Sequence, residues 1–205
     1  MFAGAHADDV ELGAGGTCAH LTRLGFDVHV LIMSDEVCPA IAALRRREAK
    51  AAGAELGVTS SKIHFLGLTD GAITCDRQAV GALRHLAATA GLNPIAVFTH
   101  SDADSHQDHI AATRIVKAAF RKTAFFKYQI RNSVVTSGFA PVIHCAVDGT
   151  YDAKLRALEQ HQSQLTAGRL PLDDVVRFDE RAGVTSSGRF GEAFELEFQD
   201  GAAGY

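Results

Sequence analysis

The sequence is poor in cysteine and proline, with four of each among its 205 residues, and it has no excess of positive charge. Cys18, Cys38, Cys75 and Cys145 are scattered without any C-x-x-C pair, which excludes a zinc knuckle or a thioredoxin-type motif. We interpret them as free thiols of a reducing, cytoplasmic compartment. The 20 Lys and Arg residues against 24 Asp and Glu residues give a net charge of −4, which argues against nucleic acid or an anionic membrane as partner.

A basic leader and a long apolar run are also lacking. The first nine residues already contain Asp8 and Asp9, so they do not predict a secretory signal peptide. No apolar run reaches the ~18 residues that a membrane helix needs. A chain of this length with 47% hydrophobic residues predicts a single domain over residues 1–205 with a sizeable core.

Apolar runs alternate with helical patterns over roughly the first 120 residues, which predicts an α/β fold. The expected strands are 1–5, 28–33, 63–66 and 95–99. The expected helices are 17–24, 40–56, 76–90 and 110–119. Right-handed crossovers turn this order into a Rossmann-like, mostly parallel sheet with flanking helices.

The last third predicts a small C-terminal β/α extension. Its expected elements are strands at 125–130, 134–136 and 143–147, a helix at 151–165, and a strand at 194–198. Residues 194–198 alternate apolar and acidic side chains, which favours the edge of the sheet.

Two polar clusters follow strands that should be neighbours. His6, Asp8 and Asp9 follow the first strand, and residues 100–109 with three His and three Asp follow the fourth. Ligands bind at the carboxyl ends of strands in such sheets, so the two clusters should converge. Adjacent carboxylates repel each other unless a cation or a proton offsets them, which favours a metal site over two unrelated solvated loops.

The available ligands are imidazole nitrogens and carboxylate oxygens, without a nearby thiolate. Three protein ligands with an open position are typical of catalytic zinc, one ion per chain. Mn²⁺ or Fe²⁺ would accept the same ligands.

Several segments in order along the chain resemble the PIG-L/LmbE-like zinc de-N-acetylases. Residues 4–13, GAHADDVELG, are similar to the family's A-H-P-D-D-x-E, and residues 105–109, SHQDH, to its H-x-D-H. Weaker similarities lie at 45–49, 65–71, 161–164 and 192–195. Ala7 stands where the family has proline, which only fixes a backbone angle there.

The resemblance implies roles for seven residues. It makes His6, Asp9 and His109 the metal ligands. It also makes Asp8 the general base toward a metal-bound water and His106 the general acid or oxyanion stabiliser, with Asp108 orienting His106.

The seventh residue is Arg45, which by the same resemblance would anchor the substrate by forking onto sugar hydroxyls or a phosphate. The alternative for Arg45 is a solvated helical face with an i,i+3 pair to Glu48.

The implied function is a metal-dependent hydrolase of a linear amide C–N bond that removes an N-acetyl group from a small amino-sugar conjugate. Neither nucleic acid nor a membrane is an expected partner, and a homo-oligomer is left open. The alternative is a non-hydrolytic nucleotide- or sugar-binding Rossmann-like module. Its glycine turn would be residues 13–17, but Cys18 occupies the third position of a G-x-G-x-x-G.

Overall fold

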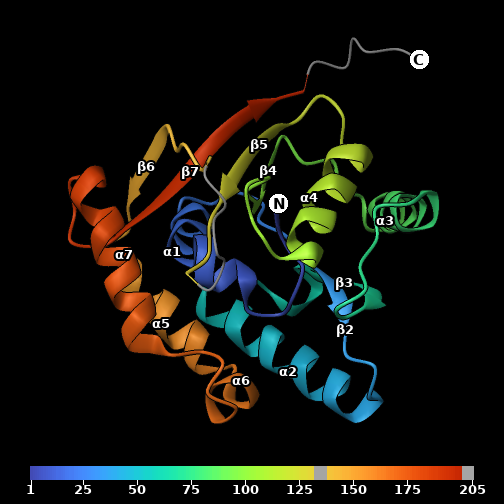
Figure 1. The fold of residues 1–205 in the computed structure, drawn as a ribbon, viewed down its shortest axis with the longest axis horizontal. Coiled ribbons are helices and arrows are strands. Elements are labelled where there is room, and N and C mark those ends of the chain that lie inside the picture. The colour runs from blue at the N-terminus through green and yellow to red at the C-terminus, as the bar shows by residue number, and fades with distance from the viewer. Residues whose placement is uncertain (132–137, 200–205) are drawn as a thin grey trace.

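The computed structural model describes residues 1–131 and 138–199. A seven-stranded sheet runs through it in the order β3-β2-β1-β4-β5-β7-β6 (Figure 1). The strands are β1 (Phe2–Gly4), β2 (Val30–Asp35), β3 (Ile63–Thr69), β4 (Ala96–His100), β5 (Ala124–Tyr128), β6 (Ile143–Ala146) and β7 (Gly191–Phe198). Strands β1 to β5 are parallel, and β7 pairs antiparallel with both β5 and β6. The α/β, Rossmann-like prediction is confirmed.

Alternating side chains of the buried strands feed two cores. In β2, Val30 and Ile32 belong to one core, whereas Leu31 and Met33 belong to the other. The first core is covered by α1 (Asp9–Arg23), α2 (Pro39–Glu55), α5 (Tyr151–Glu159), α6 (Gln162–Thr166) and α7 (Leu172–Ser186). The second is covered by α3 (Arg77–Ala90) and α4 (Gln107–Ala119), which lie together on the other side of the sheet (Figure 1).

Local signals set several boundaries as predicted. The carboxylate of Asp76 accepts a hydrogen bond from the backbone N–H of Ala79 at 2.8 Å and so caps α3. Gly91 ends that helix in the left-handed region, with φ of 67°.

The prediction for the first helix needs a correction, because α1 begins at Asp9 instead of residue 17. The glycines that suggested a turn lie inside the helix, which is kinked at Ala14. A Cβ at Gly13 would collide with the ring of Tyr128, and one at Gly16 with Val147. The glycines therefore permit close packing against neighbouring elements.

The last third departs further from the prediction. The helix expected over 151–165 is two helices, α5 and α6, interrupted at Gln160 and His161. β7 lies inside the sheet, and β6 forms its edge. Helix α7 was not predicted, and the strand expected at 134–136 lies outside the described residues.

Candidate active site

The neighbouring strands β1 and β4 bring the two polar clusters together at their carboxyl ends. Nε2 of His109 lies 3.3 Å from Nδ1 of His6 and 3.6 Å from Oδ1 of Asp9. Nδ1 of His6 lies 3.4 Å from Oδ2 of Asp9. One ligand atom from each of these three residues, which come from segments far apart in the sequence, thus lies within 4.8 Å of the other two.

These spacings fit a tetrahedral metal ion. Zinc bonds of 2.0–2.2 Å imply distances of about 3.3–3.6 Å between neighbouring ligand atoms. Three protein ligands and one open position are typical of catalytic zinc, and His6, Asp9 and His109 would supply three ligands.

Two other groups of the described residues have suitable spacing, and some of their donor atoms already have partners. In the group His100, Asp104 and His109, Nε2 of His100 already lies 3.2 Å from the amide of Ala5. In the group His6, His106 and Asp108, both Asp108 oxygens accept backbone hydrogen bonds. The group His6, Asp9 and His109 contains the predicted ligands, and within it Oδ2 of Asp9 accepts from the His6 N–H at 2.7 Å.

Carboxylates hold the outer nitrogen of both histidines. Nδ1 of His109 lies 2.9 Å from Oδ2 of Asp104, and Nε2 of His6 lies 3.0 Å from Oδ1 of Asp70. Such carboxylate–histidine pairs fix the ring orientation and the tautomer of a metal ligand. They leave Nδ1 of His6 and Nε2 of His109 facing the shared point.

The electrostatics of the cluster favour positive charge at that point. Burial lowers the pKa of His6, but the Asp9 and Asp70 carboxylates outweigh burial and raise it to about 11. Burial also lowers the pKa of His109, while Asp9 and Asp104 raise it above its ordinary value. Burial raises the pKa of Asp9, but the surrounding imidazoles hold it well below its usual range. A divalent cation would supply the same carboxylates with two positive charges.

His100 and His106 stack on the two faces of His109, at ring-centroid distances of 3.9 and 4.4 Å. Burial lowers the pKa of His100. Burial, followed by the proximity of His109 and His6, lowers the pKa of His106. Both rings therefore favour the neutral form, and His106 is the exposed one at the mouth of the cluster.

Asp8 and Arg45 lie beside the ligand group. Asp8 is the N-cap residue of α1, and its Oδ1 lies 3.7 Å from Nη2 of Arg45. Nη1 of Arg45 donates to Oε1 of Glu36 at 3.0 Å. The alternative, a pair between Arg45 and Glu48, is wrong. Glu48 instead accepts two hydrogen bonds from Ser163.

Asp108 is the residue that the resemblance predicts to orient His106. Its carboxylate accepts from the backbone N–H groups of Gly71 and Ile73, at 2.7 and 3.2 Å. Its contact with His106 is through the backbone, because the Asp108 N–H donates to Nδ1 of His106 at 3.2 Å. Asp108 therefore ties the loop after β3 to the start of α4.

Sequence reasoning missed Asp104, Asp70 and Glu36 as members of the site. Asp104 lay within the 100–109 cluster, and its position five residues before His109 carries no local signal. The similarity at 65–71 covers Asp70 without giving it a role, and no motif covers Glu36. Their roles depend on how the loops fold over the sheet edge.

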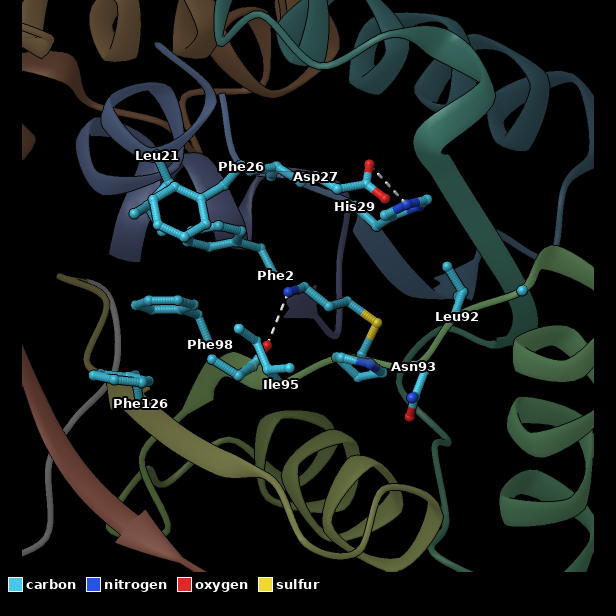
Figure 2. A pocket seen from close by; sticks show the side chains of 15 residues that line it. Phe2, Leu21, Phe26, Asp27, His29, Leu92, Asn93, Ile95, Phe98 and Phe126 are labelled. Atoms are coloured by element: carbon cyan, nitrogen blue, oxygen red, sulfur yellow. Dashed lines mark hydrogen bonds and ion pairs between the residues drawn. The ribbon is translucent and has the colours of Figure 1, made fainter. Parts of the chain in front are cut away.

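A cavity of about 460 Å³ lies at the opposite, amino-terminal edge of the sheet (Figure 2). Apolar side chains dominate its wall, among them Phe2, Phe26, Phe98 and Phe126. Its polar groups include the pair of His29 and Asp27, 3.4 Å apart. The cavity shares no residue with the histidine cluster, so it is separate from the candidate site.

Comparison with known sequences agrees with this geometry. Residues 1–120 match the family model described as PIG-L, GlcNAc-PI de-N-acetylase. The uncharacterized deacetylase YaiS of Escherichia coli (strain K12) is 25% identical over 163 residues, which cover 78% of this chain and 88% of YaiS. No helix in the described ranges is long and apolar enough to cross a membrane.

Solved structures share the fold. N,N′-diacetylchitobiose deacetylase from Pyrococcus horikoshii has a TM-score of 0.76 at 21% identity, covering 96% of this chain and 82% of that chain. The conserved protein TT1542 from Thermus thermophilus has a TM-score of 0.77 at 24% identity, and the match covers 97% of this chain and 94% of TT1542. GalB, the 4-carboxy-2-hydroxymuconate hydratase from Pseudomonas putida KT2440, has a TM-score of 0.78 at 18% identity. The match covers 100% of this chain and 98% of GalB. One fold thus carries deacetylases and a hydratase, so the reaction has to be argued from the site.

Proposed function

Because this chain belongs to the PIG-L family of GlcNAc-PI de-N-acetylases, we propose that it is a zinc-dependent N-deacetylase. Its substrate would be a small molecule that contains an N-acetylated amino sugar, and its products acetate and a free amine. The observation that carries the proposal is the spacing of His6, Asp9 and His109, which matches a tetrahedral site with an open position.

The three ligands supply two nitrogens and one carboxylate oxygen, a donor set that suits zinc and that Mn²⁺ or Fe²⁺ would also accept. A divalent ion held there supplies Lewis-acid chemistry: it lowers the pKa of a bound water to about 7 and polarises an amide carbonyl. The carboxylates of Asp70 and Asp104 keep both histidine rings turned toward it.

Asp8 is the proposed general base. It is the N-cap residue of α1 and directly precedes the proposed ligand Asp9. Asp8 accepts the proton that the water loses as its oxygen bonds to the carbonyl carbon. The C–N bond then breaks, and that proton can pass to the departing nitrogen.

His106 is proposed to stabilise the oxyanion or to protonate the amine. Its ring stacks on His109 and lies edge-on to His6, with 5.1 Å between the His6 and His106 centroids. A donor aimed at the developing oxyanion is a large contribution to such reactions. The Asp108 backbone N–H fixes Nδ1 of His106, so Nε2 is the nitrogen left for the substrate.

Arg45 is the proposed substrate anchor. Glu36 and Asp8 flank its guanidinium, and the group is buried at 8% exposure. Two flanking carboxylates offset its charge, which supports a neutral, hydroxyl-rich sugar as its ligand. The four free cysteines support a cytoplasmic location, and we propose one domain over residues 1–205.

The test is to load the purified protein with zinc and incubate it with N-acetylglucosamine, N,N′-diacetylchitobiose and N-acetylglucosamine conjugates. Free amine and acetate should appear in equal amounts, and a chelator should stop their release. Zinc-loaded protein that binds these sugars without releasing amine would support the non-hydrolytic binding module instead.

A further inference from the structure

A buried histidine behind the candidate site has no part in the chemistry described above. His161 is 0% exposed, and within residues 1–131 and 138–199 neither of its ring nitrogens has a hydrogen-bond partner. It occupies the N-cap position of α6, where the helix expected over 151–165 breaks. Burying an imidazole without hydrogen bonds is costly, so its position requires a compensating interaction.

The carboxylate of Glu11 provides that interaction. Glu11 is 3% exposed, and its Oε1 lies 3.7 Å from Nε2 of His161, an ion-pair distance. This is the only ion pair that the described part of the chain gives Glu11. A buried carboxylate that loses its counter-group strongly destabilises its surroundings.

Glu11 lies in the first turn of α1, close in sequence to the proposed base Asp8 and the proposed ligand Asp9. It follows Asp8 by three residues and Asp9 by two. Any shift that carries Glu11 toward water therefore moves the proposed base and a proposed ligand as well. Helix α1 also packs closely on its neighbours at Gly13 and Gly16, which leaves little room for compensation.

The segment that carries His161 is itself anchored to α2. Oε1 of Glu48 accepts from the Ser163 N–H at 2.8 Å, and Oε2 accepts from the Ser163 hydroxyl at 2.6 Å. Glu48 is buried, one helical turn after Arg45. The short segment from His161 to Ser163 thus links the helix of the substrate anchor to the helix of the metal ligand.

We propose that His161 is a positioning residue for the metal site: its pairing with buried Glu11 holds the first turn of α1, and with it Asp8 and Asp9, in place. This inference rests on the proposed function, because it takes His6, Asp9 and His109 to be metal ligands. It concerns metal affinity, so it can be tested without measuring turnover.

The zinc dissociation constant, measured by competition with a chromophoric chelator, is the readout. His161→Leu fills much of the same volume without a polar nitrogen, and should weaken zinc binding by about tenfold. His161→Gln keeps a donor for Glu11 and should stay within about threefold of the parent protein. His85 is exposed on α3, so His85→Leu is the matched control and should leave zinc affinity unchanged.

A second substitution separates charge pairing from packing. Adding Glu11→Gln to His161→Leu removes the carboxylate that lost its partner, so zinc affinity should recover. A packing role would not be rescued in this way. If His161→Leu does not fold, the folded yield and Tm of the double variant become the readout, and recovery supports the proposal.

Unchanged zinc affinity in folded His161→Leu overturns the proposal, as does a double variant that binds zinc or folds no better than the single one. Parent protein that binds zinc but releases no amine overturns the deacetylase function alone, because the zinc measurements still decide the role of His161.

Discussion

The Asp104 carboxylate contacts one ring nitrogen of His109, and this contact decides which nitrogen can bind an ion. Nδ1 faces the Asp104 carboxylate at 2.9 Å, so Nε2 points to the point shared with His6 and Asp9. Asp104 also accepts from the His106 N–H at 2.8 Å. One buried carboxylate therefore orients a proposed ligand and the backbone of a proposed catalytic residue.

Asp104→Asn should weaken zinc affinity or activity by about 10–100-fold, because the neutral amide holds the His109 ring less firmly. Isothermal titration with zinc measures the effect. Asp102→Asn is the control two residues earlier, since Asp102 is 44% exposed and pairs with Lys117 and Lys127. Equal zinc affinities for the two variants would remove Asp104 from the site.

Asp8→Asn tests the general base. The amide keeps the shape of the N-cap side chain but accepts protons poorly, so turnover should fall by about 10²–10⁴-fold while zinc stays bound. Metal analysis and amine release measured on the same sample separate the two effects. Near-normal turnover with zinc bound would show that Asp8 is not the base.

At the scale of helices and strands, sequence reasoning succeeded where local signals and topology agree. The clusters after β1 and β4 could be predicted to meet, because parallel strands joined by right-handed crossovers fix their order. The resemblance to the family, and not the topology, then proposed His6, Asp9 and His109 as the ligands. It did not identify Asp104 or Glu36, because loop conformations over the sheet edge depend on tertiary contacts.

The missed and misplaced elements have physical reasons as well. On α7 the buried face includes Asp179 and Gly183, which conceal the helical pattern that begins with Val175. β7 resembles an exposed edge because it carries Glu195 and Glu197. Lys127 pairs with both carboxylates, which allows an acidic strand to lie inside the sheet.

The tight packing of α1 predicts opposite effects for two glycines in helices. Gly13→Ala would force a methyl group into the buried Tyr128 ring and should lower the free energy of unfolding by about 1–3 kcal/mol. Gly81 on α3 has no atom within 4 Å of an added Cβ, so Gly81→Ala should raise it by about 0.5–1 kcal/mol. Urea unfolding compares them, and equal effects would contradict the packing argument.

At the scale of the whole molecule, a buried charge cluster connects the C-terminal third to α1. Nζ of Lys154 lies 2.9 Å from Oδ2 of Asp179 and 3.0 Å from Oε1 of Glu192. Glu192 also accepts from the N–H groups of Gly16 and Thr17, at 2.9 and 2.7 Å. One ammonium thus serves two carboxylates and joins α5, α7 and β7 to the kinked helix.

This cluster predicts a pH-dependent stability. Burial and, to a smaller extent, Glu192 raise the pKa of Asp179 from 3.8 to about 6, although Lys154 lowers it. The folded state therefore binds this proton more tightly than the unfolded state does. Its contribution to stability is complete below pH 3.8 and is lost as the pH rises through about 6.

Asp179→Asn removes this titration. The free energy of unfolding of the variant minus that of the parent should increase by about 2 kcal/mol between pH 4 and pH 7. Denaturant unfolding at several pH values measures it. Asp173→Asn, an exposed change on the same helix, is the control, and a difference that does not vary with pH would contradict the assignment.

His6 and His109 are 103 positions apart in the chain, yet their nitrogens lie 3.3 Å from each other. An ion shared by both is therefore also a cross-link, and the loop that it closes contains β2, β3 and β4 together with α1, α2 and α3. Because the two histidines come together only in the folded chain, the free energy of binding the ion would add to the stability of the whole loop. Ion removal should then lower the free energy of unfolding of residues 6–109, far beyond the ligands themselves.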